Sequence, residues 1–173
     1  MSDMGITLLP DLLLFEHFKG NWENYLIALY EYYNEDFVDH TPFFEGVPIR
    51  VRRDQKFNGM DLTFWHLISE GSVEEERIPN IRRCERIRWP RRLIECKNKQ
   101  DVRVWQNKRA KGNQQEERVI IALNDFSYVV VLAKAGKGFK LITAYWVESK
   151  HRQNKLRKEY EDYLMEKKGG FAL

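Results

Sequence analysis

Four strand-like runs between residues 98 and 148 constrain the fold of this chain more than any other feature. Within each run, apolar side chains recur with the period of a strand, and β-branched and aromatic residues are frequent. Short polar connections, among them 124–125 and 136–138, separate the last three runs, which predicts an antiparallel meander. The four runs are Val102 to Lys108, Arg118 to Leu123, Tyr128 to Lys134 and Phe139 to Val147. In the last run, strand alternation predicts that Thr143 and Tyr145 share a face with Phe139, Leu141 and Val147.

Helical periodicity flanks this region on both sides. Large apolar residues recur at helical spacing between Asn21 and Phe37, with Asn21 as the N-cap. A short helix is predicted through Phe64 to Ile68, and an arginine-rich helix runs from Pro79 to about Arg88, with a second piece starting at Pro90. The apolar stripe of the first helix comprises Trp22, Leu26, Leu29, Tyr33 and Phe37.

A final helix is predicted from about Ser149 to Lys168, with Leu156, Tyr160 and Tyr163 on one stripe. The expected fold is therefore α+β, with N-terminal helices packed on an antiparallel sheet of about four strands, and a C-terminal helix. Because 173 residues can bury one substantial core, we expect a single domain over 1–173. Its parts are an acidic helical region (1–45), a loop, strand and arginine-rich helices (46–97), the sheet (98–148) and the last helix (149–173).

Charge is distributed unevenly along the chain. Residues 1–45 contain nine acidic residues and one lysine, whereas residues 46–173 contain 28 basic and 17 acidic residues. A basic body favours binding to polyanions, although charge of this kind is also compatible with simple solubility. No membrane span and no signal peptide are indicated, so we expect a cytoplasmic protein with no membrane partner. Cys84 and Cys96 lack partners at the spacing of metal ligands, which predicts neither a zinc site nor a disulfide.

His66 and the arginines that follow it are the main candidates for chemistry. All seven basic residues between 77 and 92 are arginines, and a planar guanidinium group suits bidentate contact with phosphate. On a helical wheel Arg82, Arg83 and Arg86 cluster opposite the apolar side, which predicts an exposed cationic face. Guanidinium groups near His66 should favour its neutral imidazole, because nearby positive charge opposes protonation of the ring. The neutral form can take a proton from a 2′-hydroxyl. Purely structural interpretations remain open. His66 would be a core residue, the arginines would form a solvated helix face balanced by glutamates, and Trp89 and Trp105 would belong to the core.

Several catalytic classes lack their motifs. The sequence has no GxxxxGK[ST], GxGxxG, HExxH, GxSxG or CxxC pattern, which leaves P-loop, dinucleotide-binding, zincin, α/β-hydrolase and thioredoxin-like functions without support. The carboxylates of Glu74 to Glu76 are followed by no second acidic cluster on a strand, which argues against a metal-dependent nuclease. We expect neither a metal nor another cofactor.

The order of these features resembles a known family. A histidine in an early helix, then arginines, then a strand-rich half with DFSYVVVL (125–132) and FKLITAYWVE (139–148) is similar to the phage- and mobile-element-associated ribonucleases of the barnase, EndoU, colicin and RelE-like fold. The resemblance covers roughly residues 60 to 150. It implies helices packed on a four-stranded antiparallel sheet, and RNA cleavage without a metal by residues on the sheet and the preceding helix.

This resemblance implies a role for each candidate residue. His66 would be the general acid or base, Arg83 and Arg86 would stabilise charge, and Thr143 and Tyr145 would position the scissile phosphate. We expect RNA contacts from Arg82, Arg88, Trp89 and Trp105. The resulting hypothesis is a metal-independent endoribonuclease, such as a toxin or phage-conflict effector, with RNA as substrate and an antitoxin or immunity protein as a candidate partner. The alternative is a non-catalytic nucleic-acid- or partner-binding domain of a mobile element.

Overall fold

The computed structural model describes residues 9–169, and the expectations for residues 1–8 and 170–173 lie outside this range. The first helix starts as predicted, because the Asn21 side chain accepts a hydrogen bond from the amide of Asn24. The α-helices are α1 (Trp22–Tyr33), α2 (Leu62–Ile68), α3 (Ile81–Glu85), α4 (Trp89–Ile94) and α5 (Lys150–Gly169). Short 3-10 or π-helical segments lie at Phe15–Phe18, Asn34–Asp39 and Glu74–Glu76.

A six-stranded mixed sheet forms the centre of the molecule, in the order β1-β2-β10-β9-β8-β7. The four long antiparallel strands were correctly predicted, including the meander of the last three, but two further strands extend the sheet, and β2 pairs with β10 in the parallel direction. The strands of this sheet are β1 (Phe43–Phe44), β2 (Val47–Arg50), β7 (Val102–Lys111), β8 (Gln114–Leu123), β9 (Tyr128–Ala135) and β10 (Gly138–Trp146). Two small ribbons lie outside it: β3 (Lys56–Phe57) with β4 (Met60–Asp61), and β5 (Ser69–Glu70) with β6 (Ile78–Pro79).

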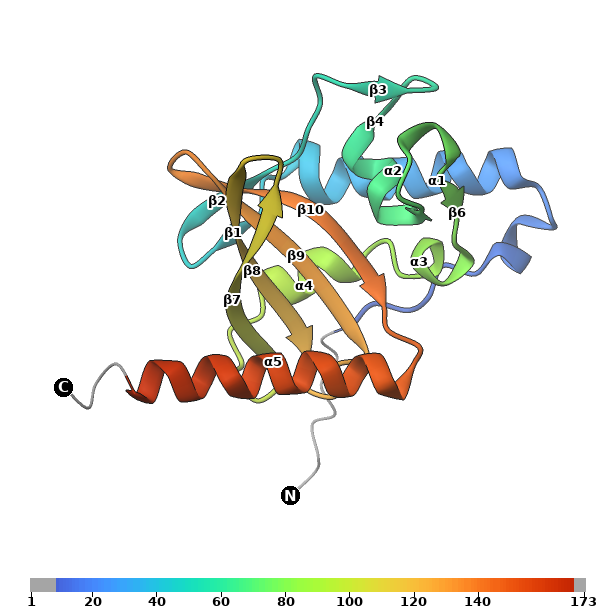
Figure 1. The fold of residues 1–173 in the computed structure, drawn as a ribbon. Helices are drawn as coiled ribbons and strands as arrows, with labels where there is room; N and C mark the ends of the chain where they lie inside the picture. Colours follow the sequence, from blue (N-terminus) through green and yellow to red (C-terminus); the bar gives the residue numbers. More distant parts are fainter. Residues whose placement is uncertain (1–8, 170–173) are drawn as a thin grey trace.

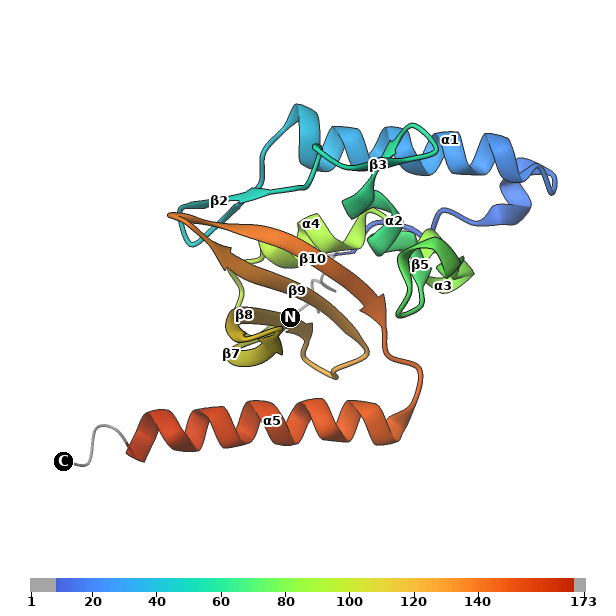
Figure 2. The same ribbon diagram turned by 45° about the horizontal axis from the view of Figure 1, so that its top comes forward.

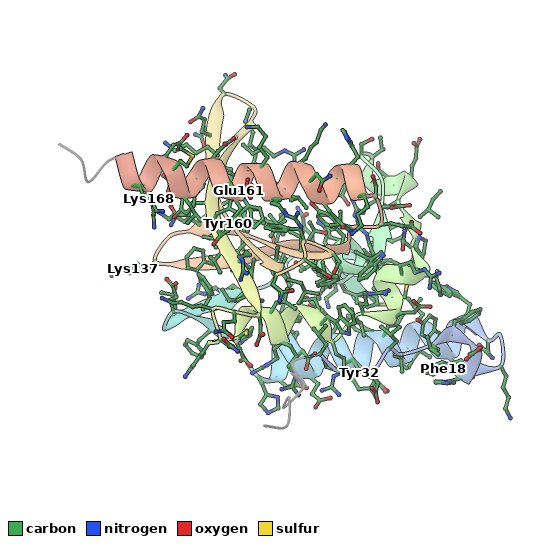
Figure 3. All side chains as sticks on the ribbon, turned by 90° about the horizontal axis from the view of Figure 1, so that it is seen from below. Phe18, Tyr32, Lys137, Tyr160, Glu161 and Lys168 are labelled. Atoms are coloured by element: carbon green, nitrogen blue, oxygen red, sulfur yellow. The ribbon has the colours of Figure 1, made fainter. Side chains whose placement is uncertain are left out.

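Helices lie on both sides of the sheet. The helices α1 to α4 cover one face and α5 runs along the other (Figure 1, Figure 2). Figure 3 shows α5 and α1 at opposite sides of the molecule, with Tyr160 of α5 on the side toward the sheet. Each face of the sheet therefore has its own core.

The larger core lies between the sheet and the helices α1 to α4. From α1 and the segment that follows it, the buried residues are Tyr25, Leu29, Tyr33 and Phe37. The predicted stripe is thus rotated by part of a turn, since Trp22 is 37% exposed and Tyr25 is fully buried in its place. The Tyr25 hydroxyl donates to the carbonyl of Leu13 at 2.7 Å, which satisfies its polar end at the edge of the core.

The smaller core lies between the sheet and α5. Trp105 is fully buried there, and Leu156, Tyr160 and Tyr163 of α5 pack against it as the predicted stripe. Most other α5 side chains are polar and exposed, which fits a helix with one covered face. No helix in the described range is long and apolar enough to cross a membrane.

A β-bulge in β10 changes which side chains share a face. The register with β9 shifts between Leu141 and Thr143, because one extra residue is inserted there. As a result Leu141 belongs to the larger core, whereas Tyr145 and Val147 belong to the smaller one. The predicted alternation, with Thr143 and Tyr145 on the face of Phe139 and Leu141, is wrong beyond the bulge.

The arginine-rich segment is not one helix. Asn80 caps α3 by accepting from the amides of Arg82 and Arg83, and α3 ends at Glu85. A second helix, α4, then begins with Trp89 and has Pro90 in its first turn, as the position of the proline predicted. This break moves Arg86 away from its neighbours on the predicted face.

Candidate functional site

The candidate site lies along the edge of β10, beyond the point where the pairing with β2 ends. The parallel strand β2 pairs only with Phe139 and Lys140, so the C-terminal half of β10 has no strand partner on that side. The helices α2 and α3 contact β10 instead, and both lie beside it in Figure 1. Side chains from α2, α3 and β10 therefore meet at this edge.

Arg83, Thr143 and the main chain of His66 make direct contacts there. The Thr143 hydroxyl donates to the His66 carbonyl at 3.0 Å. Arg83 Nη1 donates to the same carbonyl at 3.2 Å, to the Ser69 carbonyl at 2.9 Å and to Thr143 Oγ1 at 3.3 Å. One guanidinium group thus ties the end of α2 to the free edge of β10.

Two guanidinium groups lie close to the ring of Tyr145. Arg83 and Arg152 each lie 5.4 Å from the centre of its ring, within the range of cation–π attraction. Arg152 comes from the first turn of α5. Burial lowers the pKa of Arg83, while the nearby Glu70 opposes this effect. The tyrosine therefore joins the arginine of α3 to the start of the last helix.

These residues line a polar hollow of about 210 Å³, the arginine hollow. Its wall includes Arg82, Arg83, Arg152, Tyr145 and Glu70. Three guanidinium groups and two carboxylates, those of Glu70 and Glu148, line this wall, so the cations outnumber the anions and the hollow is suited to an anion such as a phosphate. Arg82 and Arg152 are both exposed, and Arg82, with a side chain 57% exposed, makes an ionic contact with Glu85 at 3.4 Å.

The His66 imidazole pairs with a carboxylate. Its Nε2 lies 2.7 Å and 2.9 Å from the two carboxylate oxygens of Glu74, and its side chain is 24% exposed. If Nε2 carries the proton and donates to Glu74, the neutral ring leaves Nδ1 as its acceptor. The expected guanidinium neighbours contact the main-chain oxygen of His66 rather than its ring. A partner carboxylate that fixes the tautomer is the arrangement found around histidine bases in general.

Arg86 does not belong to the arginine hollow. Its side chain is buried, and its guanidinium lies 4.1 Å from the ring centre of Trp146 and 4.9 Å from that of Trp89. Nη1 donates to the carbonyl of Arg82 at 2.9 Å and contacts Glu85 at 3.4 Å. The prediction that Arg86 stabilises phosphate charge is therefore corrected, because its side chain is only 8% exposed and its guanidinium is already held by Glu85, a carbonyl and two indole rings.

Arg88 points toward the acidic N-terminal region instead. It contacts Glu35 and Asp36, each at 3.5 Å, and lies 4.6 Å from the ring centre of Tyr32. It borders a separate hollow of about 200 Å³ that it shares with Arg91 and Arg92. The arginines between 82 and 92 are thus divided among the arginine hollow, the interior and this second hollow.

Both tryptophans predicted to stack on bases are buried. Trp105 has no exposed surface, and its Nε1 donates to Glu159 at 3.0 Å. Trp89 is 9% exposed and donates to the carbonyl of Pro10 at 3.0 Å. Neither ring offers a face to a base, so the structure supports their alternative interpretation as core residues.

Two residues of the site were missed by reasoning from sequence. Glu74 was treated as one of several charges that balance the arginines. Its pairing with His66 was missed because a separation of eight residues across a loop offers no periodic signal. Arg152 lies on α5, far from the arginine run, and joins the hollow only because the last helix starts at the end of β10. Within residues 9–169 no group of three or more His, Cys, Asp or Glu side chains is placed to hold a metal ion.

Comparison with known proteins adds no further assignment. No protein-family model matches the chain, and neither a curated protein nor a solved structure gives a significant match.

Proposed function

We propose that this protein is a metal-independent endoribonuclease of the cytoplasm. The observation that carries the proposal is the meeting of Arg83, Thr143 and the main-chain carbonyl of His66 at the free edge of β10, beside a hollow lined by three arginines. Cleavage of RNA through its own 2′-hydroxyl needs a base, cations around the phosphate and an acid for the leaving group. The site offers a residue for each of these needs.

In the proposed mechanism His66 acts as the base. Its Nδ1 takes the proton of the 2′-hydroxyl while Glu74 accepts from Nε2 and stabilises the imidazolium that forms. The 2′-oxygen attacks phosphorus, and the bond from phosphorus to the 5′-oxygen breaks. Arg82, Arg83 and Arg152 offset the charge that develops on the phosphate. The Tyr145 hydroxyl gives its proton to the leaving 5′-oxygen, so the products are a 2′,3′-cyclic phosphate and a 5′-hydroxyl.

A second candidate function is a non-catalytic nucleic-acid- or partner-binding domain. It is favoured by the fact that the contacts of Arg83 and His66 also join α2, β5 and β10, so both residues have a structural role. In that case the arginine hollow would bind phosphate without cleaving the chain. The two functions differ in the partner that they need. A ribonuclease that acts as a toxin or phage-conflict effector would have an antitoxin or immunity protein as partner, whereas a binding domain does not require one.

The decisive experiment compares His66→Ala with His151→Ala, since His151 is an exposed histidine on α5. End-labelled RNA is incubated with each protein in excess EDTA, and the products are tested for a 2′,3′-cyclic phosphate. We expect His66→Ala to lower the cleavage rate by at least about 10²-fold, as is usual for a lost general base, with RNA affinity nearly unchanged. His151→Ala should retain the parental rate.

The melting temperature is measured on the same samples, because a structural histidine would alter stability without altering chemistry. Cleavage by folded His66→Ala at the parental rate would remove this residue from the mechanism. Cleavage that EDTA abolishes would overturn the mechanism itself, and RNA binding without cleavage by the parental protein would favour the second function.

The arginine hollow has its own test, which does not depend on cleavage. Replacing Arg82 and Arg152 together by glutamine should reduce the slope of log affinity against log salt for single-stranded RNA by about 1.4, since each phosphate contact contributes about 0.7. Lys158→Gln is the matched control, because Lys158 pairs with Asp162 at 2.7 Å on the same helix. An unchanged slope in the double variant would show that phosphate binds elsewhere.

A further inference from the structure

A second cleft, the aromatic cleft, lies close to the candidate site and has no role in the mechanism above. Its volume is about 570 Å³, which is well above that of the arginine hollow and within the range of small-molecule sites. It lies between the β3–β4 ribbon and the segment that includes Glu74–Glu76. The space is therefore sufficient for a flat heterocyclic group.

Two aromatic rings form the apolar part of the aromatic cleft. Trp65 on α2 and Phe57 on β3 pack edge to face, with ring centres 5.6 Å apart. Trp65 Nε1 donates to the Phe57 carbonyl at 2.8 Å, which fixes the indole against the ribbon. Phe57 is nevertheless 49% exposed, so an aromatic side chain on this ribbon remains open to a ligand. An exposed aromatic of this kind is a common platform for a nucleobase.

The cations of the aromatic cleft are already engaged. Lys56 Nζ contacts the buried Asp61 at 2.9 Å. Arg77 donates to Ser69 Oγ at 3.1 Å, to the Ser69 carbonyl at 2.6 Å and to the Gly71 carbonyl at 2.8 Å. Neither group is free to clamp a phosphate, which separates this cleft from the arginine hollow.

The hydrogen-bonding groups that remain available are mainly acceptors. Among the described residues, the side chains of Gln55 and Glu75 have no hydrogen-bond or ionic partner, and both line the cleft. A carboxylate accepts hydrogen bonds only, whereas an amide both donates and accepts. The cleft is therefore matched to an uncharged, planar group that carries N–H donors on its edge.

The aromatic cleft also shares residues with the candidate site. Glu74 lines it and pairs with the His66 imidazole at 2.7 Å. Ser69 lines it too, and its carbonyl accepts from Arg83 at 2.9 Å, while the next residue, Glu70, lines the arginine hollow. The two spaces thus lie at the same β5 segment.

We propose that the aromatic cleft binds a nucleobase with an exocyclic amino group, stacked on the exposed ring of Phe57 with Trp65 beside it, and recognised by Glu75. That this base belongs to the RNA strand whose phosphate occupies the arginine hollow rests on the proposed ribonuclease function. Uracil, which has no amino group, is the base that this cleft disfavours. A free nucleoside and a base within RNA share this chemistry, and the experiment below separates them.

The experiment first titrates adenosine, cytidine, guanosine and uridine into the full chain and follows tryptophan fluorescence and calorimetric heat. These probes have no phosphate, so binding does not require the arginine hollow. We expect the three amino-bearing nucleosides to bind more tightly than uridine. Phe57→Ala should weaken their binding about tenfold or more through lost stacking. Phe43→Ala is the matched control, because Phe43 is comparably exposed but lies on β1.

Glu75→Gln tests the polar contact by itself, and as an exposed position it should leave folding intact. We expect it to reduce the preference for amino-bearing nucleosides over uridine to within about threefold, since the lost contact is a charge-assisted hydrogen bond. Equal binding of all four nucleosides by the parental protein would overturn recognition of the amino group. No binding at millimolar concentration, or binding that Phe57→Ala leaves unchanged, would overturn the cleft as a base site.

The RNA arm uses oligonucleotides that differ in one base next to a single cleavable linkage. A preference in kcat/KM that parallels the nucleoside affinities and is lost in Phe57→Ala supports a base within RNA as the occupant. If the protein cleaves RNA and Phe57→Ala does not change the base preference in kcat/KM, the cleft is not the base site, whereas the proposed ribonuclease function is retained. Nucleoside binding that Phe57→Ala weakens, in a protein that cleaves no RNA, would retain the cleft as a nucleoside site and reject the proposed catalytic function.

Discussion

Arg86→Met tests whether the middle arginine of the segment is a structural group rather than a phosphate ligand. In the structure its guanidinium lies against the rings of both Trp89 and Trp146 and contacts Glu85 at 3.4 Å. The side chains of Arg86 and Glu85 are 8% and 9% exposed, so the pair is almost entirely removed from water. Burial lowers the pKa of Arg86, whereas Glu85 acts to keep it charged.

The magnitude follows from what the substitution leaves behind. Removing one member of a buried ion pair costs about 3–5 kcal/mol, because the other charge stays buried without compensation. Glu85 keeps its contact with Arg82 at 3.4 Å, which argues for the lower end of that range. The methionine thioether also regains part of the packing against the two indole rings. We therefore expect Arg86→Met to lower the free energy of unfolding by about 3 kcal/mol.

A double-mutant cycle with Glu85→Gln separates the charge from the packing. The pair Glu85→Gln and Arg86→Met leaves no buried charge, so the double variant should be about 2 kcal/mol less destabilised than the sum of the single variants. Urea unfolding followed by tryptophan fluorescence measures these values, provided that the dependence on denaturant is unchanged. The reasoning would be refuted if each single variant lowered the free energy of unfolding by less than about 1 kcal/mol and the double variant by the sum of the two. Such a result would indicate an exposed guanidinium group.

Two further predictions concern other parts of the fold. Burial acts to raise the pKa of Glu116, but Arg118 and Lys111 outweigh it and lower that pKa below its ordinary value of 4.5, so this carboxylate stabilises the fold above pH 4.5. Glu116→Gln should therefore be less stable than the parent at pH 7, with a difference that shrinks as the pH falls below 4.5, and parallel stability curves would contradict this. Trp105→Phe should cost about 1–3 kcal/mol in a urea titration through the lost bond to Glu159, with RNA affinity unchanged. A tenfold loss of affinity without loss of stability would restore Trp105 as an RNA contact.

The parts of the fold that follow from local pattern were predicted well. The four long strands, the Asn21 cap and the α5 stripe each depend on the spacing of neighbouring residues, and such spacing can be read directly. The parallel pairing of β2 with β10 joins residues about ninety positions apart, for example Ile49 with Phe139. No local pattern encodes such a contact, so the sheet was predicted with too few strands.

The site was predicted less completely, for two physical reasons. A bulge after Leu141 reverses the alternation of β10, and alternation from sequence assumes a regular strand. The helical wheel that placed Arg86 beside Arg82 assumes one continuous helix, whereas α3 ends at Glu85. The composition of the segment was informative about phosphate-binding chemistry, but only the fold determines which guanidinium groups reach the surface.

Thr143 offers the most direct test of whether the free edge of β10 is a functional site or only the place where α2 and α3 pack against the sheet. Its hydroxyl donates to the His66 carbonyl and accepts from Arg83, so Thr143→Val removes both contacts while preserving the shape of the side chain. The His66 carbonyl keeps its bond from Arg83 at 3.2 Å, and we therefore expect a loss of only about 1 kcal/mol in the free energy of unfolding.

Catalysis should respond more strongly than stability to this change. If Thr143 positions Arg83 and His66 around the phosphate, Thr143→Val should lower kcat about tenfold or more, because small displacements of catalytic groups have large effects on rate. Thr143→Ser keeps the hydroxyl and loses only a methyl group, so it should recover most of the rate despite a comparable change in melting temperature. A rate that follows stability across both variants, rather than the presence of the hydroxyl, would assign Thr143 to packing alone.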